Sequence, residues 1–355
     1  MAVDRILVIN PGSTSTKVGY FEDVHCLFKE VIRHDGPEKK VDLSPEAEAS
    51  IRREAILAML AKKAISLKKL SALVVRGGLL KPLSSGTYLV DESVYRDLIE
   101  AVYGWHASNL GAIIALPLAR HLGIPVYTVD PVTVDEFETP ARYSGLKNLP
   151  RLSMSHALNM KAMARRAAVG MNKKYEEINL VVVHLGSGIS VSAHCRGRMI
   201  DVNNANEEGP FSMERCGTLP ALRLVRLCFS GKYSCEEMIR LLTSRGGIYS
   251  YFGTKNFARI RQMISAGSDE AEEVVEALIY QVAKEIGAMA AVLNGAVDGT
   301  VLTGGIANDR QLVAGITGRV SFIAPVIVIP GEEELEALAA GALRILRGEE
   351  KALCY

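Results

Sequence analysis

The stretch that decides the fold is Arg5-Ile-Leu-Val-Ile-Asn-Pro-Gly-Ser-Thr-Ser-Thr-Lys-Val-Gly-Tyr-Phe21. Ile6 to Ile9 form an apolar run rich in β-branched residues, the chain breaks at Asn10-Pro11-Gly12, and alternation resumes at Val18. This pattern predicts strand, tight turn, strand. Hydroxyls and backbone N–H groups gathered in one turn form a site for an anion such as phosphate. The polar side chains that would serve it include Asn10, Ser13, Ser15 and Lys17.

Two interpretations of this turn remain open on its own residues. A β-hairpin with a solvated polar turn accounts for them as well as a phosphate site does. The turn is not a Walker P-loop, because Gly12 stands where two glycines are needed and the segment after Lys17 continues as a strand.

A second copy of the pattern favours the phosphate site. At Leu180-Val-Val-Val-His-Leu-Gly-Ser-Gly-Ile-Ser-Val-Ser-Ala193 an apolar strand, a small-residue turn and an alternating strand recur. Each copy then runs into a third strand, at Cys26 to Ile32 and at Met199 to Val202. The copies lie about half a chain apart, as a duplicated domain predicts.

This duplication resembles the superfamily that holds actin, hexokinase and the chaperone ATPases. More closely, Asn10-Pro-Gly-Ser-Thr-Ser-Thr-Lys17 with His184-Leu-Gly-Ser-Gly188 is similar to the acetate and butyrate kinase family. The resemblance implies an α/β fold: a duplicated, two-domain actin/hexokinase-like (ribonuclease H-like) fold with an interdomain cleft. It places residues 1–150 and 334–355 in one domain and residues 151–333 in the other. It also assigns nucleotide binding in the second turn to His184, Gly186, Ser187 and Gly188.

The composition limits which binding partners and which cellular location are expected. The 355 residues carry 41 basic and 40 acidic side chains, for a net charge of +1, so nothing favours nucleic acid or an anionic membrane. Apolar runs fall short of a bilayer span, and the chain enters a strand directly after Asp4, so we expect no signal peptide. The six cysteines include no C-x-x-C pair, and we expect a reduced, cytoplasmic location.

Candidate site residues of the first half follow predicted strands. Arg76-Gly77-Gly78-Leu-Leu-Lys-Pro82 follows the strand Ala72 to Val75, and Asp130 ends the strand Pro125 to Val129, where ligands bind in doubly wound sheets. A surface loop and a turn before Pro131 are the plain alternatives. Butyrate kinases carry a similar Arg-Gly-Gly-Leu-Leu-Lys-Pro run, which implies a catalytic role for Arg76. Acetate kinases place their arginine three residues earlier, where this chain has Leu73.

The resemblance implies further roles in this half. Trp105 and His106, in Trp-His-Ala-Ser-Asn-Leu-Gly111, are assigned to the acid substrate, although a lone histidine near a helix start is usually a capping or surface residue. Asp130 is assigned to catalysis and, together with Asn10, to magnesium, which keeps most of its waters and takes one or two carboxylates. The helix predicted from Pro45 to Lys63 shows no chemistry, only packing.

The second half supplies the remaining candidates. His156 lies in the first turn of a helix predicted to run to Gly170, where the helix dipole favours a bound anion. The family has a histidine there that contacts the transferring phosphoryl group, preceded by an aromatic residue. This chain has Ser155 in place of the aromatic, and Ser155 is expected to line the pocket for the acid's carbon tail. Arg215, in the polar loop Asp201 to Gly217, matches the family's second active-site arginine; a solvated loop arginine is the alternative.

Two late motifs complete the set. Gly304-Gly305 and Asn308 match the adenosine motif, with Asn308 expected as the next helix's N-cap. Glu333, in Glu332-Glu333-Glu334, aligns with the family's carboxylate near the metal; acidic residues in a helix's first turn are also expected from the dipole alone. The final helix is predicted from Glu334 to about Arg347.

The sequence thus predicts a short-chain fatty acid kinase of the butyrate type, which transfers the γ-phosphoryl group of ATP directly to a carboxylate, with Mg²⁺. A carboxylate is ionised at pH 7, so no general base is needed. Acetate, propionate and isobutyrate remain alternative acids. An actin-like or chaperone-like nucleotide switch is the alternative from another class. From the family we expect a homodimer or a multiple of dimers.

Overall fold

The computed structural model describes residues 3–34 and 43–355, so the turn-rich stretch expected from His34 to Asp42 lies, apart from His34, outside the described residues. The described chain divides into two compact units. The first contains Met1–Val134 and Glu333–Tyr355, and the second contains Asp135–Glu332. From the sequence, the first domain is expected to continue to residue 150. Residues 135–142 pair with the second unit instead: the backbone N–H of Glu138 donates to Ile200 O (3.0 Å).

The first unit is built on a six-stranded sheet of order β3-β2-β1-β4-β6-β5. β2 pairs antiparallel with β1, with Ile6 opposite Phe21, and β4 pairs parallel with β1, with Ile6 opposite Ala72. β4 and β6 are buried throughout, as expected for strands covered on both faces. The strands are β1 Arg5–Pro11, β2 Ser15–Glu22, β3 His25–Arg33, β4 Ala72–Val75, β5 Thr87–Leu89 and β6 Val126–Val129.

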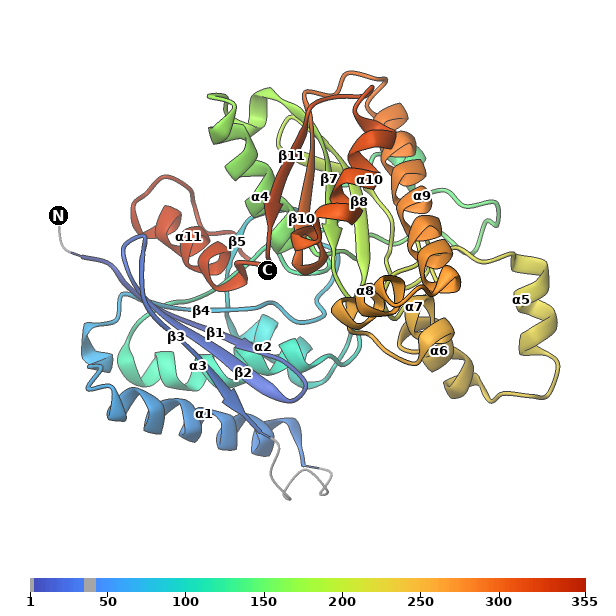
Figure 1. The fold of residues 1–355 in the computed structure, drawn as a ribbon. Helices are drawn as coiled ribbons and strands as arrows, with labels where there is room; N and C mark the ends of the chain where they lie inside the picture. The colour runs from blue at the N-terminus through green and yellow to red at the C-terminus, as the bar shows by residue number, and fades with distance from the viewer. Residues whose placement is uncertain (1–2, 35–42) are drawn as a thin grey trace. The chain divides into compact units, whose positions relative to one another are not determined.

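Helices cover both faces of this sheet (Figure 1). α1 (Pro45–Lys62) and α3 (Leu110–Leu122) lie on one face, and α11 (Glu334–Leu346) lies on the other. The ends of the helices follow local chemistry. Ser44 Oγ accepts from Ala47 N (3.3 Å) at the start of α1, and Gly123 ends α3 with φ of 68°, where glycine avoids the strain of a side chain.

The second unit repeats the plan on a five-stranded sheet of order β11-β10-β7-β8-β9. β7 and β8 form the second antiparallel ribbon, with Val182 opposite Ser192, and β10 joins β7 in parallel. α4 (Ala157–Gly170) covers one face and α9 (Asp269–Val292) the other (Figure 1). The strands are β7 Asn179–Leu185, β8 Ile189–Cys195, β9 Arg198–Val202, β10 Gly299–Gly304 and β11 Val326–Pro330.

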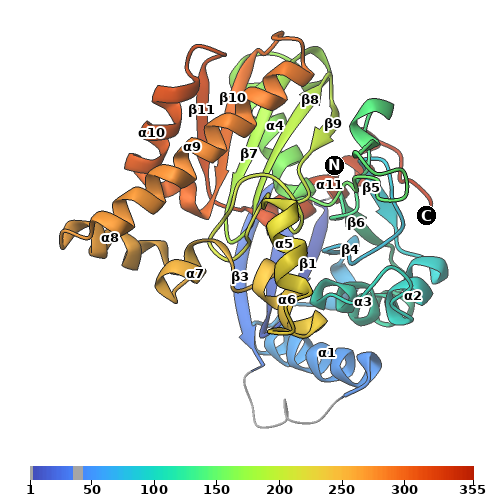
Figure 2. The same ribbon diagram turned by 90° about the vertical axis from the view of Figure 1, so that its right-hand side faces the viewer.

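Shorter helices complete both units. Figure 2 shows α5 to α8 beyond one end of the second sheet. The α-helices not yet given are α2 Glu92–Ile99, α5 Ala221–Cys228, α6 Cys235–Thr243, α7 Gly247–Phe252, α8 Phe257–Ser265 and α10 Arg310–Val320. The 3₁₀ turns are η2 Leu67–Lys69, η3 Ala107–Asn109, η4 Thr139–Arg142, η5 Tyr175–Glu177 and η6 Gly305–Asn308.

Most predicted elements are confirmed, including both strand–turn–strand ribbons with their third strands. The long helix expected from about Glu270 to Leu293 is α9. One detail is wrong: Asn308 is not the N-cap of α10. That position belongs to Asp309, whose side chain accepts from Leu312 N (2.8 Å), while Asn308 is the last residue of η6.

Candidate functional site

One cluster of polar side chains lies at the carboxyl edge of the first sheet. Asn10 ends β1, Arg76 follows β4, and both contact Glu334 at the start of α11. Asn10 Nδ2 donates to Glu334 Oε2 (2.7 Å), and Arg76 Nη1 lies 2.7 Å from Glu334 Oε1. Lys17 Nζ lies 3.9 Å from the same carboxylate. The cluster therefore joins the first turn to a basic residue and a carboxylate.

The two glycines after Arg76 allow its loop to pack closely. A Cβ added at Gly77 would lie 2.7 Å from Pro131 Cβ, and one at Gly78 would lie 2.4 Å from Asn109 Oδ1. Asn109 Oδ1 also accepts from Leu79 N (3.0 Å). The Arg-Gly-Gly run therefore places Arg76 at the end of its strand by letting backbone approach the neighbouring segments.

Asp130 lies buried at the end of the neighbouring parallel strand, β6. Its Oδ1 accepts from Ser85 Oγ (2.6 Å) and from Gly86 N (2.8 Å). Asp130 itself adopts a φ of 40°, which is uncommon for a residue with a side chain. These bonds show that the carboxylate holds the loop before β5.

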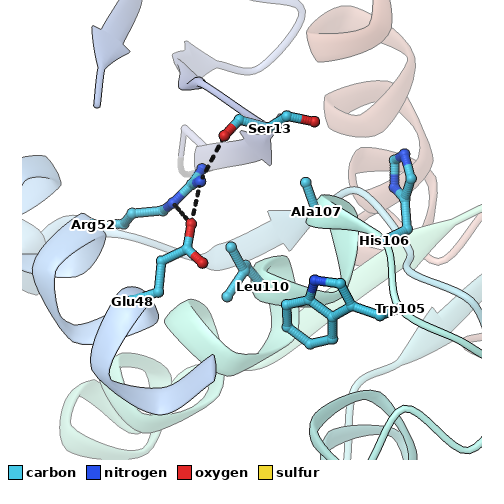
Figure 3. Close-up of a pocket in the computed structure, with 7 residues that line it drawn as sticks. All are labelled: Ser13, Glu48, Arg52, Trp105, His106, Ala107 and Leu110. Atoms are coloured by element: carbon cyan, nitrogen blue, oxygen red, sulfur yellow. Dashed lines mark hydrogen bonds and ion pairs between the residues drawn. The ribbon is translucent and has the colours of Figure 1, made fainter. Parts of the chain in front are cut away.

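A hollow of about 330 Å³ adjoins the first turn. Figure 3 shows Trp105 and Leu110 on one side and the ion pair of Glu48 with Arg52 on the other. Trp105 is 45% exposed, and His106 Nδ1 lies 2.7 Å from Ser108 Oγ. The lining residues are Ser13, Glu48, Arg52, Trp105, His106, Ala107 and Leu110.

The second unit brings two predicted histidines together. The rings of His156 and His184 stack with centroids 4.0 Å apart and an interplanar angle of 11°. His156 Nδ1 lies 2.9 Å from Ser190 Oγ, and His184 Nδ1 lies 2.8 Å from Asn159 Oδ1. Asn159 Nδ2 donates to Glu332 O (3.2 Å), which orients its oxygen toward His184. These partners fix both rings beside the N-terminus of α4, where an anion is favoured.

Arg215 lies against the second turn. A Cβ added at Gly188 would lie 2.5 Å from Arg215 Nη1, so only glycine leaves room for the guanidinium. Burial lowers the pKa of Arg215 from its ordinary value, against the opposing effect of Glu214. Arg215 Nε is buried without a hydrogen-bond partner among the described residues. A buried N–H without a partner is costly, and a bound anion would satisfy it.

The polar loop is attached to the turn that it faces. Ser212 Oγ donates to Ser187 O (2.6 Å) and accepts from Arg215 N (3.2 Å). At the other end of the turn, a Cβ on Gly186 would lie 2.7 Å from His184 Nε2. The turn of Gly186 to Gly188 is therefore bounded by an imidazole and by a guanidinium.

The glycine pair after β10 lies beside this turn. Thr303 is opposite His184 in the parallel ladder. Gly304 has φ of 92°, and a Cβ there would lie 2.3 Å from Leu185 O. Apart from its chain neighbours, no atom of the described residues lies within 4 Å of a Cβ built at Gly305, and Asn308 Nδ2 donates to Gly305 O (2.9 Å). The motif thus presents open backbone next to the β7–β8 turn.

Two predicted site residues, Ser155 and Glu333, lie in local surroundings that differ from those expected. Ser155 is 6% exposed, with its hydroxyl toward Met199 Sδ (3.9 Å). Glu333 is the N-cap of α11, with φ of 26°, and its negative charge acts on Lys29. Glu334, which sequence reasoning passed over, contacts Asn10 and Arg76 instead. Among residues 3–34 and 43–355, no group of three or more His, Cys, Asp or Glu side chains could hold a metal ion.

Comparison with known proteins gives one family match. The model of the Acetokinase family matches residues 147–322. This range contains His156, His184, Arg215 and the Gly304-Gly305 pair.

Solved structures with low sequence identity share the fold. An acetate kinase from Porphyromonas gingivalis has a TM-score of 0.80 at 20% identity, with 97% of this chain and 100% of that chain covered. A propionate kinase from Francisella tularensis subsp. tularensis has a TM-score of 0.72 at 18% identity, with 95% and 98% covered. A putative N-acetylmannosamine kinase from Listeria monocytogenes has a TM-score of 0.53 at 13% identity, with 98% and 100% covered. The predicted α/β class, with the actin/hexokinase-like fold, is confirmed.

No helix of the described residues is both long enough and apolar enough to cross a membrane.

Proposed function

From the acetokinase match of residues 147–322, we propose that the chain is a short-chain carboxylate kinase that converts ATP and a carboxylate to ADP and an acyl phosphate. The match carries the proposal because it covers Arg215 and both stacked histidines. Arg215 supports it independently, since its buried Nε lacks a partner among the described residues and is of the right kind to bind a phosphoryl oxygen.

The chemistry requires positioning and charge neutralisation. The acceptor carboxylate is already ionised at neutral pH, so one of its oxygens attacks the γ-phosphorus while the bond to the β-phosphate oxygen breaks. Arg215, with His156 and His184 beside the N-terminus of α4, would neutralise the charge that spreads over the transferring group. Asp130 is not needed as a base, and its bonds to Ser85 and Gly86 suit it to holding a loop.

A divalent cation fits the first cluster. Asn10 and Glu334 offer an amide and a carboxylate in contact with each other (2.7 Å), and Mg²⁺ typically takes one or two carboxylates with water and substrate phosphates. When bound, Mg²⁺ would neutralise phosphate charge. We propose Glu334, in place of the sequence-assigned Glu333, as the carboxylate that holds it, because Glu334 contacts Asn10 and Arg76.

We further propose butyrate as the preferred acid, with acetate and propionate as the alternatives. The hollow beside the first turn offers an apolar wall of Trp105, Ala107 and Leu110. Each methylene that is buried there would contribute about 0.8 kcal/mol, or roughly fourfold in affinity. The homodimer, or multiple of dimers, and the cytoplasmic location stay predictions.

The decisive experiment is hydroxamate trapping. The protein is incubated with Mg-ATP, hydroxylamine and, separately, acetate, propionate, butyrate and isobutyrate. An acyl phosphate reacts to a coloured hydroxamate, and we expect the fastest formation with butyrate. If no acid yields hydroxamate while ATP still binds, the nucleotide-switch alternative replaces the kinase.

A further inference from the structure

A buried arginine of α1 lies behind the β1–β2 turn. Arg52 is 1% exposed. Its Nη1 donates to Gly12 O (2.8 Å), to Ser15 O (3.3 Å) and to Thr16 Oγ1 (3.2 Å). Its Nη2 donates to Ser13 O (3.5 Å). One guanidinium therefore binds three carbonyl oxygens and one hydroxyl of the same turn.

The charge of Arg52 is balanced on its own helix. Glu48, one helical turn earlier, accepts from Arg52 Nη2 (2.5 Å) and Nε (3.0 Å), as Figure 3 shows for this pair. A buried cation is strongly destabilising unless it is paired and its hydrogen bonds are satisfied. Glu48 and the turn carbonyls together meet that requirement. Helix α1 is therefore more than the packing element that its sequence pattern predicts.

Because peptide groups are planar, this contact also fixes the direction of the N–H groups on the opposite side of the turn. A trans peptide is planar, so a C=O and the N–H of the next residue point in opposite directions. The carbonyls of Gly12 and Ser13 point toward Arg52. The N–H groups of Ser13 and Thr14 must therefore point away from α1. Successive N–H groups that point the same way form a concave site for an anion.

We propose that Arg52 is a positioning residue that holds the β1–β2 turn in its anion-binding form, by binding the carbonyl side of the turn and leaving the amide side to a phosphate. The identity of the phosphate as part of a nucleotide rests on the function proposed above. Arg52 acts through the turn. Its contribution is to the shape of the site and, through it, to nucleotide affinity.

The test compares two adjacent arginines of α1. Arg52→Met removes every donor to the turn, and Arg52→Lys keeps the charge but loses the fork that spans three carbonyls. Arg53→Met is the matched control, because Arg53 Nη2 donates to Ser50 Oγ (3.2 Å) on its own helix. Hydrogen exchange of the peptide that covers residues 10–17 reports on the turn. The KM for ATP and the kcat, measured separately, report on the site.

We expect faster exchange in residues 12–16 for both Arg52 variants, with KM for ATP raised about tenfold, the effect of losing about one hydrogen bond to a charged group, and a smaller change in kcat. Arg53→Met should change neither. Should Arg52→Met fail to fold, Arg52→Lys carries the same comparison. Exchange that matches wild type in the Arg52 variants, or an equal rise in KM for Arg53→Met, would overturn the proposal.

The hydrogen-exchange measurement also separates the positioning role of Arg52 from the proposed kinase function. If the wild type binds no nucleotide, the proposed function fails, but faster exchange of residues 12–16 in Arg52→Lys still supports the role of Arg52 in the turn. If the wild type is an active kinase and exchange is unchanged, the positioning role fails alone.

Discussion

The two β-ribbon turns share a backbone plan and differ in where their arginine lies. The first turn, between Pro11 and Ser15, is rich in hydroxyls and has Arg52 on its carbonyl side. The second, between Leu185 and Ile189, is built from glycine and serine and closes through Gly186 N to Gly188 O (3.1 Å), with Arg215 packed against it.

Hydrogen-bond saturation distinguishes the roles of the two arginines. Arg52 uses its donors on the turn and on Glu48. Arg215 keeps a buried Nε without a partner among the described residues. A saturated buried guanidinium is part of the scaffold, whereas one with a spare donor is suited to a ligand. The same residue type thus serves structure in one unit and, we propose, catalysis in the other.

Removing Arg215 should have the largest effect. Arg215→Ala should lower turnover by roughly a thousandfold or more, the scale for an arginine that neutralises charge in phosphoryl transfer, and leave ATP binding nearly unchanged. The measurement is kcat by hydroxamate formation beside ATP affinity by calorimetry. Arg223→Ala, exposed on α5, is the control. A loss below tenfold would remove Arg215 from the catalytic role.

The glycines of the two turns should respond unequally. Gly188→Ala would place a Cβ 2.5 Å from Arg215 Nη1 and displace the guanidinium, so we expect about a hundredfold loss in kcat. Among the described residues, the Cβ of Gly12→Ala would meet only Ser15 O at 3.5 Å, an ordinary contact, so this variant should lower kcat less than threefold. Steady-state kinetics of both variants checks this. Equal losses would show that the two turns are under the same steric constraint.

The apolar wall adjoins the first turn, and its removal tests the substrate proposal. Trp105→Ala should reduce the preference for butyrate over acetate by roughly fourfold for each methylene that loses its contact. The readout is kcat/KM on both acids. Tyr103→Ala is the control, because Tyr103 is similarly exposed and does not line the hollow. An unchanged ratio in Trp105→Ala would place the acid's tail elsewhere.

In the second unit, Arg151 also binds a backbone carbonyl, and it has more acidic neighbours than Arg52. Arg151 Nη1 donates to Ala141 O (2.8 Å) and to Asp201 (2.9 Å), and Arg151 also pairs with Glu208 (2.9 Å). Burial, followed by the charge of Glu208, raises the pKa of Glu285. Arg52, by contrast, is paired with Glu48 at the first turn.

The acidic neighbours of Glu285 predict the smallest effect, which is a change in thermal stability. A raised folded-state pKa means that the native protein holds its proton while the unfolded chain releases it, so stability falls as pH rises through that window. Glu285→Gln should therefore raise Tm by roughly 2–4 °C at pH 7 and by less as pH falls toward about 4. Thermal melts across pH, with the exposed Glu273→Gln on α9 as control, test it. An equal gain at both pH values would contradict the assignment.

Local patterns were enough to predict most elements. Both ribbons follow from alternation around glycine-bearing turns, and α9 follows from helical periodicity. These signals lie within a few residues of the structure that they specify. The positions of Arg76 and Asp130 at strand ends followed from the same logic.

Contacts between distant segments could not be predicted. Arg52 looks like a solvated residue of an amphipathic helix, because its partners lie some forty residues earlier. Among three successive glutamates, the one that faces Asn10 depends on where α11 begins, and the cap at Glu333 turns Glu334 inward. Asp309 caps α10 in place of Asn308, and it also forms an ion pair with the distant Arg261 (2.6 Å).

The first unit contains residues from both ends of the described chain. Its last helix is therefore synthesised long after the rest of the unit. The ribosome completes residues 135–332, a continuous unit, before it reaches α11. Until then the first sheet lacks the helix on one face, and Asn10 and Arg76 lack Glu334. On a growing chain, the first turn is thus made early, but its carboxylate partner is made more than three hundred residues later.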